Sequence, residues 1–187
     1  MECPSDNLDP RIRRTRQMLF QALTQLLAEK SFEAISVQDI AERSTVNRAT
    51  FYDHFDDKFA LLEQMIGDRF RSHFVARMSG AQPGCPSAHK QLVLSVCDFL
   101  ADVSSGCQKH QKQFEPVVEA RVKAVMREFL LEGLRKQGVR KADAEMRATL
   151  ASWALYGAAL EWSRHKPTSP EILADSVLPL LQKALYP

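Results

Sequence analysis

Apolar residues recur at steps of three and four along most of the chain, which is the spacing of one buried face of an α-helix. The first such segment runs from Pro10 to about Lys30, with Asp9 as its expected N-cap, and its apolar positions are Ile12, Leu19, Phe20, Leu23, Leu26 and Leu27. We find no segment with the alternating pattern of a β-strand. The pattern therefore predicts an all-α protein of about nine helices.

Two short helices are predicted to follow the first. Ser36 is the expected N-cap of a helix over residues 37–44, and Asp39 resembles the acidic member of a capping box. After a break of two residues, a third helix is predicted over residues 47–54. Two short helices joined by a tight turn and braced by a third can present one helix to the major groove of DNA. Residues 9–56 are therefore predicted to form a helix-turn-helix DNA-binding domain.

The rest of the chain, residues 57–187, is predicted to form a larger helical domain. Two Gly and two Pro within residues 80–86 predict a loop, and Pro116 is expected to open a helix that ends at Gly138. A last helix is expected near the end of the chain, with a kink at Pro179.

Composition narrows the class of protein. The 187 residues are 45% hydrophobic and 26% charged, as in an ordinary globular chain. No apolar run is long enough for a membrane helix and the start of the chain lacks a signal-peptide pattern, so a cytoplasmic protein without membrane contact is expected. The cysteine and histidine spacings match no metal-ligand motif, and neither metal nor cofactor is predicted; the residues considered are Cys3, Cys85, His89, Cys97, Cys107 and His110.

The formal net charge of +2 is too small to indicate nucleic-acid binding by itself. Residues 1–60 even carry ten acidic side chains against eight basic ones. Four of these basic residues gather at the start of the first predicted helix: Arg11, Arg13, Arg14 and Arg16. Any interaction with DNA must therefore depend on where the charges lie rather than on their sum.

Polar side chains are expected on the outward face of the third helix, because Val46, Phe51 and Phe55 are expected to point inward. A guanidinium can pair with guanine, a carboxamide with adenine, and a threonine with a thymine methyl group or a phosphate. Further polar groups nearby can hold the DNA backbone, as can the free amides at the start of a helix. The side chains that provide these groups are Asn47, Arg48 and Thr50 for bases and Ser36, Tyr52, His54 and Lys58 for phosphates.

Over about residues 10–65, this segment resembles the DNA-binding signature of tetracycline-repressor (TetR) regulators. The most specific part is the run Phe51-Tyr52-x-His54-Phe55 with Lys58 after it. The resemblance implies phosphate contacts by Tyr52, His54 and Lys58, and a groove-facing side formed by the residues at 47, 48 and 50.

Two positions depart from that signature. Thr45 stands in the turn where relatives usually carry glycine, which bears on the geometry of the turn. Asp53 occupies an outward position that is often basic or neutral in relatives, so it implies either a contact with cytosine or weaker binding.

The resemblance also implies the roles of the larger domain. Its middle helices are expected to surround a pocket for a small organic ligand, and its last two helices to pair with their copies in a homodimer. Six small residues between positions 148 and 159 permit close helix approach, although an ordinary buried helix within one subunit would also explain them. Apolar and aromatic side chains are typical of ligand cavities. Residues of this kind are more often plain core, and the pocket candidates are Phe70, Phe74, Cys97, Phe99, Met126, Trp153 and Tyr156.

These observations predict a transcriptional repressor that binds palindromic double-stranded operator DNA and is released by a small ligand. Two recognition helices must lie about 34–36 Å apart to enter successive major grooves, so a ligand that favours another spacing lowers DNA affinity. One alternative is a helix-turn-helix protein that binds DNA without any ligand. The other is an enzyme fused to a helix-turn-helix, which is disfavoured because the sequence contains no recognisable catalytic motif.

Overall fold

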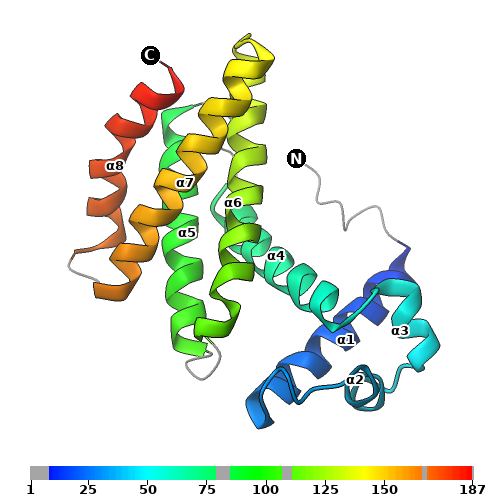
Figure 1. The fold of residues 1–187 in the computed structure, drawn as a ribbon. Coiled ribbons are helices and arrows are strands. Elements are labelled where there is room, and N and C mark those ends of the chain that lie inside the picture. Colours follow the sequence, from blue (N-terminus) through cyan, green and yellow to red (C-terminus); the bar gives the residue numbers. More distant parts are fainter. Residues whose placement is uncertain (1–8, 79–84, 107–110, 166–167, 187) are drawn as a thin grey trace. The chain divides into compact units, whose positions relative to one another are not determined.

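The structure is a computed structural model that describes residues 9–78, 85–106, 111–165 and 168–186. Within these ranges the chain forms eight α-helices and no strand (Figure 1). The predicted all-α class is therefore confirmed. The helices are α1 (Pro10–Glu29), α2 (Val37–Ser44), α3 (Arg48–His54), α4 (Lys58–Arg77), α5 (Pro86–Gly106), α6 (Gln111–Lys136), α7 (Lys141–His165) and α8 (Pro170–Leu185).

The chain divides into two compact units, Met1–Met65 and Ile66–Pro187. The division falls within α4, whereas the functional ranges predicted from the sequence, 9–56 and 57–187, meet before this helix begins. Those functional ranges stay a prediction.

In the first unit, α1, α2 and α3 pack around a small apolar core (Figure 1). The carboxylate of Asp9 accepts a hydrogen bond from the amide of Arg11 at 2.8 Å, so the predicted N-cap of α1 is confirmed. The apolar stripe predicted for this helix supplies part of the core, and the fully buried side chains include Leu19, Leu23, Ile40 and Phe51.

The turn between α2 and α3 depends on the backbone of Thr45, which has a left-handed conformation with φ 56° and ψ 25°. Thr45 is the one residue other than glycine with positive φ among the described residues. Its amide donates to the carbonyl of Glu42, and the amide of Val46 donates to the carbonyl of Ala41. The left-handed conformation costs a residue with a Cβ atom about 1–2 kcal/mol, which explains why glycine suits this turn.

Replacing Thr45 by glycine should stabilise the protein. Thr45→Gly removes the steric cost at positive φ but adds freedom to the unfolded chain, so the free energy of unfolding should rise by about 0.5–1 kcal/mol. Urea denaturation measures the change. Thr45→Ala is the matched control, because alanine keeps the Cβ atom and should give no comparable gain; a Thr45→Gly variant less stable than the wild type would contradict the prediction.

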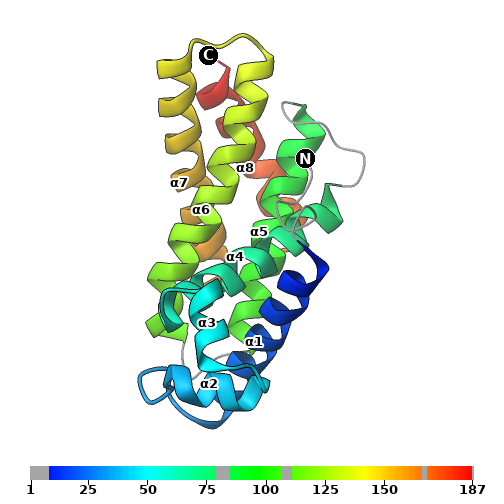
Figure 2. The same cartoon turned by 90° about the vertical axis from the view of Figure 1, so that its right-hand side faces the viewer.

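The second unit contains the later part of α4 together with α5, α6, α7 and α8. Helix α7 packs against α5, α6 and α8, and α6 and α7 run side by side from the tight connection near Gly138 (Figures 1 and 2). Aromatic rings of α4 enter the core: the centroid of Phe70 lies 5.2 Å from that of Phe99, and Phe74 lies 5.1 Å from Phe129. The core therefore contains several residues predicted to line a pocket.

Pro116, Pro179 and Gly138 were each predicted to shape a helix of the second unit. Helix α6 starts at Gln111 and continues through Pro116, so the prediction that Pro116 opens a helix is wrong. A proline removes one backbone hydrogen bond, and packing along this long helix compensates for that loss. Pro179 likewise lies inside α8. Gly138 has φ 76° directly after α6, and the amide of Val139 donates to the carbonyl of Leu134, which confirms the predicted C-cap.

Other sequence predictions concern membranes, metals and loops. No helix in the described ranges is long and apolar enough to cross a bilayer. Across the same ranges, no group of three or more His, Cys, Asp or Glu side chains is arranged to hold a metal ion. Most of the predicted loop 80–86, together with Cys3, Cys107 and His110, lies outside the described residues.

Candidate nucleic-acid interface

Helix α3 presents two chemically distinct faces. Phe51 and Phe55 are 0% and 6% exposed and fill the core of the first unit, as predicted. Tyr52 is 47% exposed although it adjoins Phe51. The remaining side chains of α3 are exposed or half-buried, and they include Arg48, Thr50, Asp53 and His54. This seven-residue helix thus has polar side chains on its outward face and aromatic side chains on its buried face.

Arg48 and Tyr52 lie one turn apart and contact each other. The guanidinium carbon of Arg48 is 5.7 Å from the centroid of the Tyr52 ring, and one of its nitrogens is 3.4 Å from the tyrosine hydroxyl oxygen. Arg48 forms no ion pair with the described residues. Its donors are therefore oriented by an aromatic ring but remain available to an acceptor outside the protein.

Asn47 lies just before α3 and acts as its N-cap, whereas the sequence predicted a helix that includes it. Its side-chain oxygen accepts a hydrogen bond from the amide of Ala49 at 2.8 Å. A bidentate pair with adenine uses both the oxygen and the nitrogen of the carboxamide. In the present arrangement only the nitrogen of Asn47 is uncommitted.

Ser36 caps α2 through the predicted capping box. The amide of Asp39 donates to the Ser36 hydroxyl oxygen at 3.1 Å, and the amide and hydroxyl of Ser36 each donate to the Asp39 carboxylate at 2.7 Å. These hydrogen bonds hold the pKa of Asp39 well below its usual range. The predicted anion site at the start of α2 is therefore already occupied in part by a carboxylate of the protein itself.

Lys58 is oriented differently from the other predicted phosphate ligands. Its ammonium group donates to backbone carbonyls of the loop between α1 and α2. By contrast, Tyr52 is 47% exposed and His54 is half-buried.

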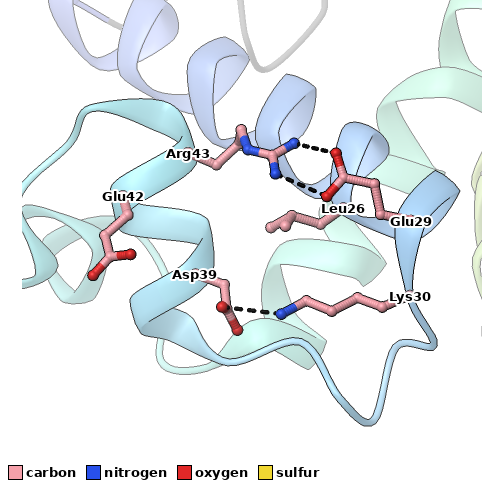
Figure 3. A pocket seen from close by; sticks show the side chains of 6 residues that line it. All are labelled: Leu26, Glu29, Lys30, Asp39, Glu42 and Arg43. Carbon is pink, nitrogen blue, oxygen red and sulfur yellow. Dashed lines mark hydrogen bonds and ion pairs between the residues drawn. The ribbon is translucent and has the colours of Figure 1, made fainter.

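Ion pairs between α1 and α2 neutralise another part of the first unit (Figure 3). The guanidinium of Arg43 meets the Glu29 carboxylate with two hydrogen bonds of 2.7 and 2.8 Å, and Lys30 lies 3.0 Å from Asp39. These pairs surround a shallow, charged depression, and the remaining side chains that line it are Leu26 and Glu42. Since these charges satisfy one another, the depression does not attract an anion.

Other basic residues of the first unit lie at the start of α1. Arg11 and Arg14 are exposed and form no ion pair within the described part of the chain. The guanidinium carbon of Arg16 lies 5.5 Å from the centroid of Phe55, the residue that follows α3. The arginine-rich start of α1 therefore adjoins the end of α3.

In the second unit, most predicted pocket residues are buried. Cys97, Phe99 and Met126 are fully buried, and Phe70 and Phe74 pack on their neighbours. Tyr156 is 3% exposed, and its hydroxyl oxygen has no hydrogen-bonding partner among the described residues. Trp153 is different because it is 61% exposed, with the Lys123 ammonium 3.4 Å from its ring centroid. That exposure does not fit a residue lining an internal cavity.

The structure also buries a histidine that sequence reasoning did not place in this core. His89 is 1% exposed, and its Nδ1 atom lacks a hydrogen-bonding partner in the described residues. Burial lowers the pKa of His89 and raises the pKa of the Cys97 thiol to about 12. Cys97 therefore stays protonated and unreactive at neutral pH. Only the apolar spacing of α5 around His89 could have signalled its burial.

An exposed apolar stripe runs along α7, and α8 also carries exposed apolar side chains. Met146, Leu150 and Trp153 are spaced by four and three residues and are 62%, 60% and 61% exposed. On α8, Ile172 and Leu180 are 54% and 69% exposed. Among the small residues used to predict helix pairing, Ala148, Ala151 and Ala159 are instead buried within the unit.

Comparisons with known proteins agree with this picture. Residues 19–65 match the family model described as "Bacterial regulatory proteins, tetR family". YxbF of Bacillus subtilis (strain 168), an uncharacterized HTH-type transcriptional regulator, is 45% identical over 60 residues, and this match spans 32% of the present chain and 16% of that protein.

Solved structures are similar over nearly the whole chain. A TetR-family regulator from Streptomyces coelicolor A3 has a TM-score of 0.62 at 21% identity and covers 96% of this chain and 98% of its own. The regulator FadR from Bacillus subtilis, solved in complex with stearoyl-CoA, has a TM-score of 0.51 at 15% identity and covers 88% of this chain and 96% of its own. At these identities the likeness establishes a shared fold.

Proposed function

We propose that the protein is a transcriptional repressor of the tetR family that binds a palindromic operator as a homodimer in the cytoplasm, since residues 19–65 match the model of that family. The observation that carries the proposal is the outward face of α3, where Arg48 and Tyr52 extend into solvent from a helix fixed by buried aromatic rings. A short helix anchored by buried side chains can enter a major groove while its own packing in the protein stays intact.

The DNA contacts fall into two classes. Arg48 and Thr50 read base edges, and Asn47 adds its side-chain nitrogen while its oxygen caps α3. Tyr52 and His54 hold phosphates, and Ser36 joins them when its hydroxyl turns away from Asp39. The exposed carboxylate of Asp53 can accept a hydrogen bond from cytosine and would repel a phosphate.

The arginine-rich start of α1 extends this surface by contacting phosphates beside the recognition helix. The double variant Arg11→Ala/Arg14→Ala should weaken binding to operator and to random duplex by similar factors. Each lost phosphate contact should also lower the slope of log affinity against log salt by about 0.9. Gel-shift titrations at several salt concentrations measure this slope.

Arg135→Ala/Lys136→Ala at the end of α6 is the matched control, because it removes the same charge from exposed positions in the other unit. A double α1 variant with the same slope as this control would exclude phosphate contacts by Arg11 and Arg14.

The exposed apolar side chains on α7 and α8 support the homodimer. A Cβ atom built on Gly157, which lies on the exposed side of α7, meets no described atom within 4 Å. Packing inside the unit therefore does not require a glycine at this position, whereas close approach of a second copy would. In the proposed dimer, the large apolar side chains on the same side of α7 are buried against the second copy.

A small organic ligand is the proposed effector. The buried hydroxyl of Tyr156 and Nδ1 of His89 have no partners among the described residues, so a ligand with a polar group in this apolar core could satisfy one of them. The stearoyl-CoA complex of FadR supports a ligand role for this fold, since it is a structural relative. The alternative, DNA binding without an effector, predicts that no compound bound by the protein changes its operator affinity.

Selection of bound fragments from random duplex DNA tests the proposed function. The expected result is a palindrome whose half-sites lie about one helical turn apart or slightly more. Recovery of fragments without a shared sequence, at an affinity equal to that for bulk DNA, would overturn the proposal.

A further inference from the structure

Lys58 begins α4, and its side chain reaches the loop between α1 and α2. Its Nζ atom lies 2.9 Å from the carbonyl oxygen of Phe32, 3.1 Å from that of Glu33 and 2.6 Å from that of Ile35. An ammonium group has three hydrogens, and each has an acceptor here. No donor of Lys58 is left for a phosphate oxygen.

Aromatic rings complete the surroundings of this charge. The Lys58 ammonium lies 4.8 Å from the ring centroid of Phe32 and 5.8 Å from that of Phe59. These two rings pack edge to face at 5.1 Å, and Phe32 is 2% exposed. Contacts with the faces of aromatic rings favour a cation that has lost part of its hydration.

The three carbonyls belong to the segment that leads into α2. Ser36, the N-cap of α2, follows directly after Ile35. Carbonyl oxygens that converge on one point repel one another, and a cation at that point offsets the repulsion. The position of this loop, and with it the start of α2, therefore depends on Lys58.

We propose that Lys58 is a positioning residue that holds the α1–α2 loop and the start of α2 in place, and that it does not contact the operator itself. Its effect on DNA binding rests on the proposed function and is transmitted through Ser36 and α2. This role differs from the phosphate contact implied by the resemblance to TetR regulators, in which the ammonium would point toward the DNA.

Two substitutions separate the roles. Lys58→Met keeps an apolar side chain but removes the charge and the donors, whereas Lys58→Arg keeps the charge on a planar group that does not fit three converging carbonyls. We expect both variants to lower the melting temperature by about 4 °C or more and to weaken operator binding several-fold. The slope of log affinity against log salt should stay that of the wild type in Lys58→Met.

A phosphate contact gives the opposite pattern. Lys58→Met would then have the melting temperature of the wild type, and its slope of log affinity against log salt would fall by about 0.9. Lys58→Arg would bind the operator nearly as well as the wild type. Any one of these results would overturn the proposal. If Lys58→Met does not fold, which is the extreme of the expected loss, Lys58→Arg decides the binding comparison.

Lys30→Met is the matched control, because it removes another lysine of the same unit that forms only a partly exposed ion pair with Asp39. Its melting temperature should change much less than that of Lys58→Met. A wild-type protein that binds no specific duplex would remove the proposed function, and the melting temperatures of the Lys58 variants would still decide the structural role.

Discussion

Arg48→Ala should lower the affinity for the selected operator by about 1–3 kcal/mol, which is about 5- to 150-fold, and should relax the preference at one base position. The reason is geometric. The Arg48 guanidinium is oriented by the Tyr52 ring and forms no ion pair with the described residues, so its donors can form a bidentate pair with guanine. Gel-shift titrations on a panel of operators, each changed at one base pair, measure both effects.

The control for this variant is Arg135→Ala, an exposed arginine at the end of α6 that carries the same charge. It should leave both the affinity and the base preference unchanged. If Arg48→Ala weakens binding equally for every base at every position, Arg48 contacts a phosphate and not a base. If it changes nothing, α3 is not the recognition helix.

The double variant Leu150→Glu/Trp153→Glu should be a monomer and should lose operator affinity by about 100-fold or more. Both side chains lie on the exposed stripe of α7, and burying two carboxylates against a second copy is strongly unfavourable. One recognition helix alone then contacts one half-site. Analytical ultracentrifugation measures the assembly state, and titration on the palindrome measures the affinity.

Val75→Glu makes the same kind of change at an apolar residue of α4 that is 49% exposed and outside the stripe. This control should remain a dimer and keep its affinity. A dimeric double variant, or a wild type that sediments as a monomer at concentrations where it binds the palindrome, would contradict pairing through α7 and α8.

Local interactions were the part of this fold that the sequence could predict. The caps formed by Asp9 and Ser36, and the C-cap at Gly138, depend on residues within a few positions of one another. The burial of Phe51 and Phe55 likewise follows from their four-residue spacing on a single turn of helix. For the same reason α2 has the residues predicted for it.

Interactions between distant segments could not be predicted in this way. The ammonium of Lys58 finds its acceptors more than twenty positions earlier in the chain, and no pattern near Lys58 reports them. The aromatic side chain of Trp153 is of a type that lines apolar pockets, but the packing of α7 leaves it on the exposed side. Pro116 favours the start of a helix by its local preference, yet α6 begins at Gln111 and continues through it.

In the proposed dimer, the apolar stripe on α7 links the amount of this protein to its activity. On the proposed mode of assembly, a lone copy leaves those side chains in water, so pairing competes with dilution and the paired fraction rises with abundance. Where most copies are single, doubling the expression level would nearly quadruple the number of pairs. Repression of a gene under such control would rise faster than linearly with the concentration of its regulator.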